Sequence, residues 1–156
     1  MLTLSESRQI IDATIQQARR FNVYISVAVC DSHGRLIALN RMDGAVDWEV
    51  DRCSMGKAVA AAIIGCPSYR LFERLRTGVP RLSSCTVVSP RGQRGGLSII
   101  IKGSVVQGGC GVSGAPTAEQ DEECARAGIE KIGVAKIEMD LANYADGLSL
   151  SITSSA

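Results

Sequence analysis

The first segment of the chain carries its apolar residues on one stripe at helical spacing, at Leu4, Ile11, Ile15 and Ala18. Thr3 and Glu6 have the spacing of a capping box, in which each side chain accepts a hydrogen bond from the other residue's backbone N–H. Asn22 suits the end of the helix, because asparagine tolerates the left-handed backbone that often follows a last turn. The pattern therefore predicts a helix between Thr3 and Asn22.

The pattern then changes to a period of two, with Val23, Ile25, Val27 and Val29 alternating with smaller or polar residues. Residues 31–34 have turn chemistry, and residues 36–42 return as a second strand. Residues 97–102 and 104–109 predict two more strands, and residues 85–89 are a short β-prone patch. The sequence thus predicts hairpins, which require antiparallel pairing.

A second helix is predicted to run through Ile64, with either Asp47 or Asp51 as its N-terminal cap. Its residues 58–64 are apolar on every side, which is typical of a helix buried all round.

Pro67 fits the first turn of a third helix over residues 68–76. Thr117 is the expected cap of a last helix that ends near Lys131.

The order of elements is helix, two strands, two helices, two or three strands, helix. This order predicts an α+β fold in which helices flank an antiparallel sheet. We expect one domain over residues 1–141, followed by a serine-rich tail over residues 142–156. A sheet with so few strands has exposed edges, and these favour pairing into a homodimer or a larger even-numbered homo-oligomer.

Composition excludes several classes of protein. A net charge of +1 argues against nucleic-acid binding, which usually needs a basic excess. No apolar run reaches the roughly 18 residues that span a bilayer, so we expect no membrane partner and a cytoplasmic location.

The six cysteines form no C-x-x-C pair, and only one histidine is present, so no metal site is expected. In a reducing compartment these cysteines are buried side chains, or include one reactive thiol.

Residues 109–114 match the G-x-G-x-x-G dinucleotide motif and lie between a predicted strand and a predicted helix. Too little chain follows Asp140 for the further strand–helix units of a dinucleotide-binding fold, and the segment upstream reads as hairpins. We therefore interpret the segment as a glycine-rich corner, where the backbone needs positive φ or close approach. The helix start behind it could hold an anionic group.

Six fragments in the same order resemble the GlcG/HbpS-like family, which includes the C-terminal domain of PduO proteins. They cover roughly residues 3 to 132 and are Asn22–Asp31 with Gly34–Leu36, Arg41–Ala45, Lys57-Ala58, Gly95–Ile99, Gly109–Ala115, and Glu119 to Ala125. Ser98 stands where that family's strand entry has proline.

The resemblance implies an antiparallel sheet flanked by helices and even-numbered assemblies. It also implies one of several functions, because family members are associated with haem binding and redox sensing, with cobalamin-related or glycolate-utilisation operons, and with aromatic-compound degradation. Fold does not fix function in such a family.

One hypothesis is a cofactor-free enzyme that performs proton transfer on a small acidic metabolite, as an isomerase, deaminase or lyase. Lys57 lies on an apolar helical stripe, where burial could make it a base or nucleophile; the alternative is an ammonium that extends to the helix end. Asp43 and Glu119 are the candidate acidic helpers. On this hypothesis Lys57→Met loses activity and keeps its fold.

Six further residues are candidate ligand contacts. Arginine suits bidentate pairing with a carboxylate, and an indole could line the same pocket; the side chains concerned are Arg41, Trp48, Arg74 and Arg81. Cys110 and Ser113 lie in the glycine segment, where free backbone N–H groups could lower a thiol pKa.

The other hypothesis is a haem- or tetrapyrrole-binding redox sensor or accessory protein. Iron needs an axial ligand such as His, Cys, Met or Tyr, and the single histidine, His33, lies in a predicted hairpin turn. The sequence therefore leaves two cofactor states open: none, or haem.

Overall fold

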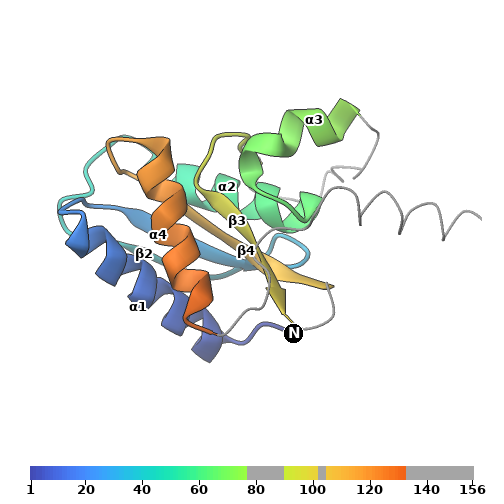
Figure 1. The fold of residues 1–156 in the computed structure, drawn as a ribbon, viewed down its shortest axis with the longest axis horizontal. Helices are drawn as coiled ribbons and strands as arrows, with labels where there is room; N and C mark the ends of the chain where they lie inside the picture. Colours follow the sequence, from blue (N-terminus) through green and yellow to red (C-terminus); the bar gives the residue numbers. More distant parts are fainter. Residues whose placement is uncertain (77–89, 102–104, 133–156) are drawn as a thin grey trace, which may run out of the picture.

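The computed structural model describes residues 1–76, 90–101 and 105–132. The elements, in chain order, are α1 (Leu4–Arg20), β1 (Ser26–Asp31), β2 (Leu36–Arg41), α2 (Val50–Ile64), the 3-10 helix η1 (Ser68–Arg70), α3 (Leu71–Arg76), β3 (Gly96–Ile101), β4 (Val105–Ser113) and α4 (Ala118–Glu130) (Figure 1). The predicted α+β class is confirmed. The β-prone patch at 85–89 and the predicted tail lie outside the described residues.

The four strands form one antiparallel sheet in the order β2-β1-β4-β3. Helices α1 and α4 pack together on one face, and α2 packs on the other (Figure 1). Strands β1 and β4 are therefore central and covered on both sides, whereas β2 is an edge strand whose residues are half-buried or exposed. None of the described helices is both long and apolar enough to cross a membrane.

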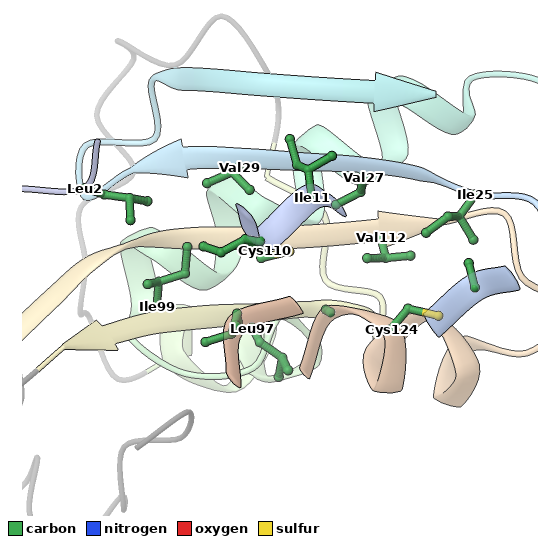
Figure 2. Packing of buried hydrophobic residues seen from close by; sticks show 14 of the residues in the cluster. Leu2, Ile11, Ile25, Val27, Val29, Leu97, Ile99, Cys110, Val112 and Cys124 are labelled. Atoms are coloured by element: carbon green, nitrogen blue, oxygen red, sulfur yellow. The ribbon is translucent and has the colours of Figure 1, made fainter. Parts of the chain in front are cut away.

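The main core lies between the sheet and the α1–α4 layer (Figure 2). Val27 and Val29 of β1 point into it beside Cys110 and Val112 of β4 (Figure 2). The alternation read from the sequence thus identified the inward face of β1. The other face of β1 is buried as well, because the small side chains of α2 pack directly on it.

The start of α1 follows the predicted capping box. The Glu6 N–H donates to the Thr3 hydroxyl over 3.1 Å, and the Thr3 N–H donates to the Glu6 carboxylate over 2.8 Å. Asn22 follows the helix with a φ of 54°, the left-handed value expected of it. These three residues act through contacts local in the sequence.

The predicted cap of α2 is wrong. Neither Asp47 nor Asp51 occupies the cap position, which belongs to Glu49 with a φ of 60° and no side-chain capping bond. The Glu49 carboxylate instead pairs with Arg52 at 3.1 Å and with Arg91 at 3.3 Å. The Glu49 carboxylate is therefore engaged in two ion pairs, and it makes no capping hydrogen bond to the backbone of α2.

Gly109 and Gly111 do not form a corner, because β4 continues through them to Ser113. A Cβ built on Gly109 would lie 2.1 Å from the Ala58 carbonyl oxygen, and one on Gly111 would lie 2.0 Å from the Ser54 carbonyl oxygen. Close approach of α2 to the sheet therefore requires these glycines. Positive φ is needed only at Gly114, which has a φ of 119°.

Candidate functional site

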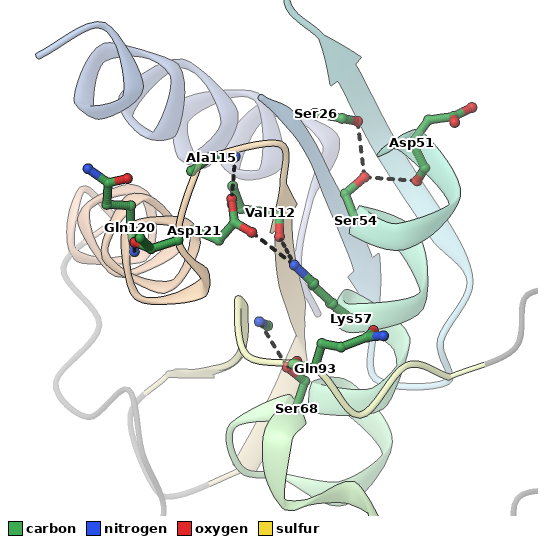
Figure 3. Close-up of polar contacts among 12 residues, drawn as sticks. Ser26, Asp51, Ser54, Lys57, Ser68, Gln93, Val112, Ala115, Gln120 and Asp121 are labelled. Carbon is green, nitrogen blue, oxygen red and sulfur yellow. Dashed lines mark hydrogen bonds and ion pairs between the residues drawn. The ribbon is translucent and has the colours of Figure 1, made fainter. Parts of the chain in front are cut away.

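Lys57 lies on the sheet-facing side of α2, and its side chain is buried. Its ammonium donates to the Val112 carbonyl oxygen over 2.8 Å and to Asp121 Oδ2 over 3.0 Å (Figure 3). The contacts connect α2, the end of β4 and the first turn of α4. The alternative in which Lys57 extends to the helix end is therefore wrong: the ammonium is buried and paired.

The carboxylate that reaches Lys57 is Asp121 and not the predicted Glu119. Asp121 is buried, and its second oxygen accepts a hydrogen bond from the Ala115 N–H over 3.0 Å. Glu119 lies two residues earlier with 75% of its side chain exposed. A sequence signal for this difference existed, since Asp121 shares helical spacing with Ala125 and Gly128 on the apolar face of α4.

The buried pair lies directly beneath the entry to β3. Gly95 has a φ of 118°, and a Cβ there would lie 2.8 Å from the Val112 carbonyl oxygen and 3.0 Å from Lys57 Nζ, so glycine is required where this backbone covers the ammonium. The Gly96 N–H donates over 3.0 Å to the hydroxyl of Ser68, which in turn donates to the Gln93 carbonyl (Figure 3). Backbone and hydroxyl groups therefore close the space around Lys57.

A network of charged side chains, several of them half-buried or buried, lies next to this region. Arg94 donates to Glu122 over 3.0 Å, lies 3.9 Å from the Glu119 carboxylate, and stacks over the Tyr69 ring with its guanidinium carbon 4.2 Å from the centroid. Glu122 also pairs with Arg126 at 3.6 Å. These side chains connect the segment that precedes β3 with η1 and α4, next to the buried pair.

Asp121 should give the folding stability a specific pH dependence. Burial raises the pKa of Asp121, and the Lys57 ammonium and the Ala115 N–H only partly offset that rise. The folded state then binds a proton that the unfolded state has already released, so this group's contribution to stability falls as the pH rises through the folded pKa. We expect the wild type to gain free energy of unfolding relative to Asp121→Asn as the pH falls from about 7 toward about 4.

Urea unfolding of both proteins across that pH range measures the difference. Subtracting the variant removes the opposite contributions of Glu6 and Asp31, whose pKa values are lowered by hydrogen bonds to Thr3 and Arg35. A difference that stays constant with pH would contradict the prediction.

A separate groove, which we call the strand-edge groove, runs along β2 and the end of α1 with a volume of about 690 Å³. Its lining combines apolar, amide and charged side chains: Ile15, Arg19, Asn22, Val23, Tyr24, Leu39, Asn40, Arg41, Met42 and Asp43. The predicted ligand residue Arg41 and the predicted acidic helper Asp43 both line this groove. Lys57 does not line this groove. The site residues predicted from the sequence therefore do not form a single site.

Arg19 was missed by the sequence analysis, although it lies in the last turn of α1 just before the predicted helix end. Within the described part of the chain, the side chains of Arg19 and Arg41 make no ion pair or hydrogen bond, and both residues are exposed. Tyr24 and Met42 line the same groove and are residue types that can ligate iron. The groove is thus lined by the guanidinium groups of Arg19 and Arg41, by two side chains of types that can ligate iron, and by apolar residues such as Ile15.

The remaining predicted ligand residues are dispersed. Trp48 is 88% exposed on the loop before α2, and Ser113 is half-buried at the end of β4. Arg74 is buried and hydrogen-bonds the Cys66 thiol. Arg81 lies outside the described residues.

Cys110 corrects the expectation of a lowered thiol pKa. Its side chain is in the main core, and burial raises its pKa to about 12. Burial likewise raises the pKa values of Cys30 and Cys124 to about 12. Thiols that stay protonated are poor nucleophiles, so these three are core residues and unsuited to redox sensing. Among the residues described, no three Cys, His, Asp or Glu side chains gather closely enough to hold a metal ion.

Comparison with known proteins gives a consistent picture. HbpS from Streptomyces reticuli, solved as a double mutant, is 31% identical with a TM-score of 0.70 over 83% of this chain and 85% of that one. A 15.0 kDa protein from the dhaT-dhaS intergenic region of Citrobacter freundii is 28% identical over 133 residues, which are 83% of this chain and 90% of that protein.

The haem complex of PduOC is 24% identical and shares the fold, with a TM-score of 0.70 over 88% of this chain and 99% of that one. The family described as "Haem degrading protein HbpS-like" matches residues 2–130, which is most of the chain. This protein therefore belongs to the HbpS-like family.

Proposed function

We propose that this protein binds a tetrapyrrole of the haem class in the strand-edge groove. The observation that carries the proposal is the pairing of two unengaged guanidiniums, Arg19 and Arg41, with an apolar wall in one groove. Membership of a family named for haem degradation supports the same ligand class.

The side chains of the groove fit such a ligand. A haem is a flat apolar ring with two carboxylates on one edge and an iron that takes His, Cys, Met or Tyr. Ile15 and Val23, which pack on the α1 side of the sheet, offer apolar contacts to the ring, whereas Arg19 and Arg41 suit its carboxylates. The volume of about 690 Å³ lies within the range of about 300–1,000 Å³ usual for ligand sites.

The charged residues of the groove would bind the ligand's carboxylates, and its apolar residues would contact the ring. When bound, haem supplies a redox-active iron, for which Tyr24 and Met42 are the ligand types present in the groove. The arginines orient the carboxylate edge, and the apolar wall excludes water from one ring face.

A haemin titration followed by visible absorption tests the proposal. We expect a saturable Soret band with the wild type, and loss of that band when Asn40→Trp fills the exposed edge of the groove. Leu36→Trp is the matched control, because Leu36 is exposed on the same strand but does not line the groove. Equal haemin binding by both variants, or a spectrum of free haemin with the wild type, would refute the site.

A second candidate function is the cofactor-free isomerase, deaminase or lyase, which the buried acid–base pair of Lys57 and Asp121 favours. A substrate would have to displace Asp121 or bind through the remaining donor, because two of the three ammonium donors are already used. Deuterium uptake from heavy water by small keto acids, measured by NMR, tests this activity. Uptake no faster than in buffer would count against it.

We also infer that the chain forms an even-numbered homo-oligomer in the cytoplasm. The edge strand β3, which does not line the strand-edge groove, supports pairing between copies, because an edge strand presents backbone groups that favour a partner strand. Light scattering on the purified protein measures the subunit number, and a monomer at all concentrations would exclude the oligomer.

A further inference from the structure

The strand-edge groove is lined by two arginines whose side chains have no partner among the described residues. Arg8 and Arg76 are likewise exposed and unpaired among those residues, but they do not line the groove. Arg35, Arg52 and Arg94 each pair with a carboxylate within 3.1 Å. Arg19 and Arg41 make no such contact with any described residue, although they line one groove. Their positive charge is therefore available to an anionic ligand.

The possible iron ligands are held less favourably. The Met42 side chain packs against the main core. The Tyr24 ring lies against Gly44, where an added Cβ would be 3.2 Å from it. His33 is exposed in the β1–β2 turn and does not line the groove. The groove thus has two arginines available to bind carboxylates. Its two possible iron ligands, Tyr24 and Met42, instead pack against other residues.

We propose that the groove recognises the dicarboxylate edge of the ring through Arg19 and Arg41, so that a metal-free porphyrin binds as well as haem. This inference rests on the proposed function and specifies its ligand chemistry. The ring supplies apolar contact to the wall, and the two guanidiniums supply the charge-assisted hydrogen bonds.

Asp43 is the carboxylate in the lining, and it opposes this recognition. Like charges repel across a groove, so removing the Asp43 charge should tighten binding while removing either arginine weakens it. The two kinds of variant therefore change the binding affinity in opposite directions. A general loss of folding would weaken binding in both.

Porphyrin fluorescence provides the test, with metal-free protoporphyrin IX, its dimethyl ester and haemin as three probes. We expect protoporphyrin IX to bind within about threefold of haemin and the ester to bind at least about tenfold more weakly, since esters cannot form the ion pairs. Arg19→Gln and Arg41→Gln should each weaken protoporphyrin IX binding by roughly three- to fivefold, and Asp43→Asn should tighten it by roughly twofold.

Arg8→Gln is the matched control, because Arg8 is exposed on α1 and does not line the groove. Circular dichroism and thermal unfolding confirm that each variant is folded before its titration is interpreted.

Two outcomes distinguish failure of this inference from failure of the proposed tetrapyrrole binding. If haemin binds in the groove but protoporphyrin IX does not, or if the ester binds equally well, recognition depends on iron or on the ring alone and the inference is wrong. If none of the three probes binds the folded wild type, the proposed function itself is wrong.

Discussion

Replacing Lys57 by Met is expected to lower the free energy of unfolding by about 3–5 kcal/mol. Lys57 and Asp121 are 5% and 4% exposed, so the variant leaves a carboxylate buried without its counter-charge. The Val112 carbonyl also loses its 2.8 Å hydrogen bond from the ammonium. The sequence alone predicted that this variant would keep its fold, and the buried contacts reverse that expectation.

Urea unfolding at neutral pH measures the loss, with Lys131→Met as the matched control because Lys131 is exposed after α4. The double variant Lys57→Met with Asp121→Leu should recover most of the stability, since removing both charges leaves no unpaired ion. If Lys57→Met is as stable as the control, the pair contributes little and the ammonium is more accessible than its contacts indicate.

Substituting Gly111 by Ala should cost about 3 kcal/mol, at the upper end of the usual range of overpacking effects or above it. The new methyl carbon would lie 2.0 Å from the Ser54 carbonyl oxygen and 2.4 Å from the Ala58 backbone nitrogen. Both atoms belong to the α2 backbone, which cannot rotate away as a side chain can. Helix α2 must therefore move off the sheet and lose contact along β1 and β4.

Thermal and urea unfolding of Gly111→Ala against Val105→Ala measure this cost. Val105 lies on the same strand with 59% of its surface exposed, so its truncation tests the strand without the contact to α2. Equal midpoints for the two variants would show that α2 accommodates a side chain and that the close approach is not required.

Most elements of the fold could be predicted because their signals are local. The Thr3–Glu6 capping box and the left-handed Asn22 involve residues that lie within a single helix or at its end. The alternation in β1 likewise needs no partner to be recognised. The cap of α2 could not be predicted, because Glu49 is held by Arg91, 42 residues away.

The glycine segment shows why a motif can be seen and still be misread. Its spacing was visible, and so were two physical reasons for glycine, positive φ and close approach. Choosing between them at Gly109 and Gly111 requires the position of α2, which the sequence around residue 110 does not contain.

The candidate site was predictable only in part, for the same reason. The sequence by itself determined the α+β class and the family, and it identified Lys57 and Arg41 as candidate site residues. Only the tertiary structure decided their surroundings: it paired Lys57 with Asp121, 64 residues away, and placed Arg41 and Arg19 in the lining of one groove. Helical and strand periods fix which face a side chain occupies, but the packing of helices on the sheet fixes which charges meet.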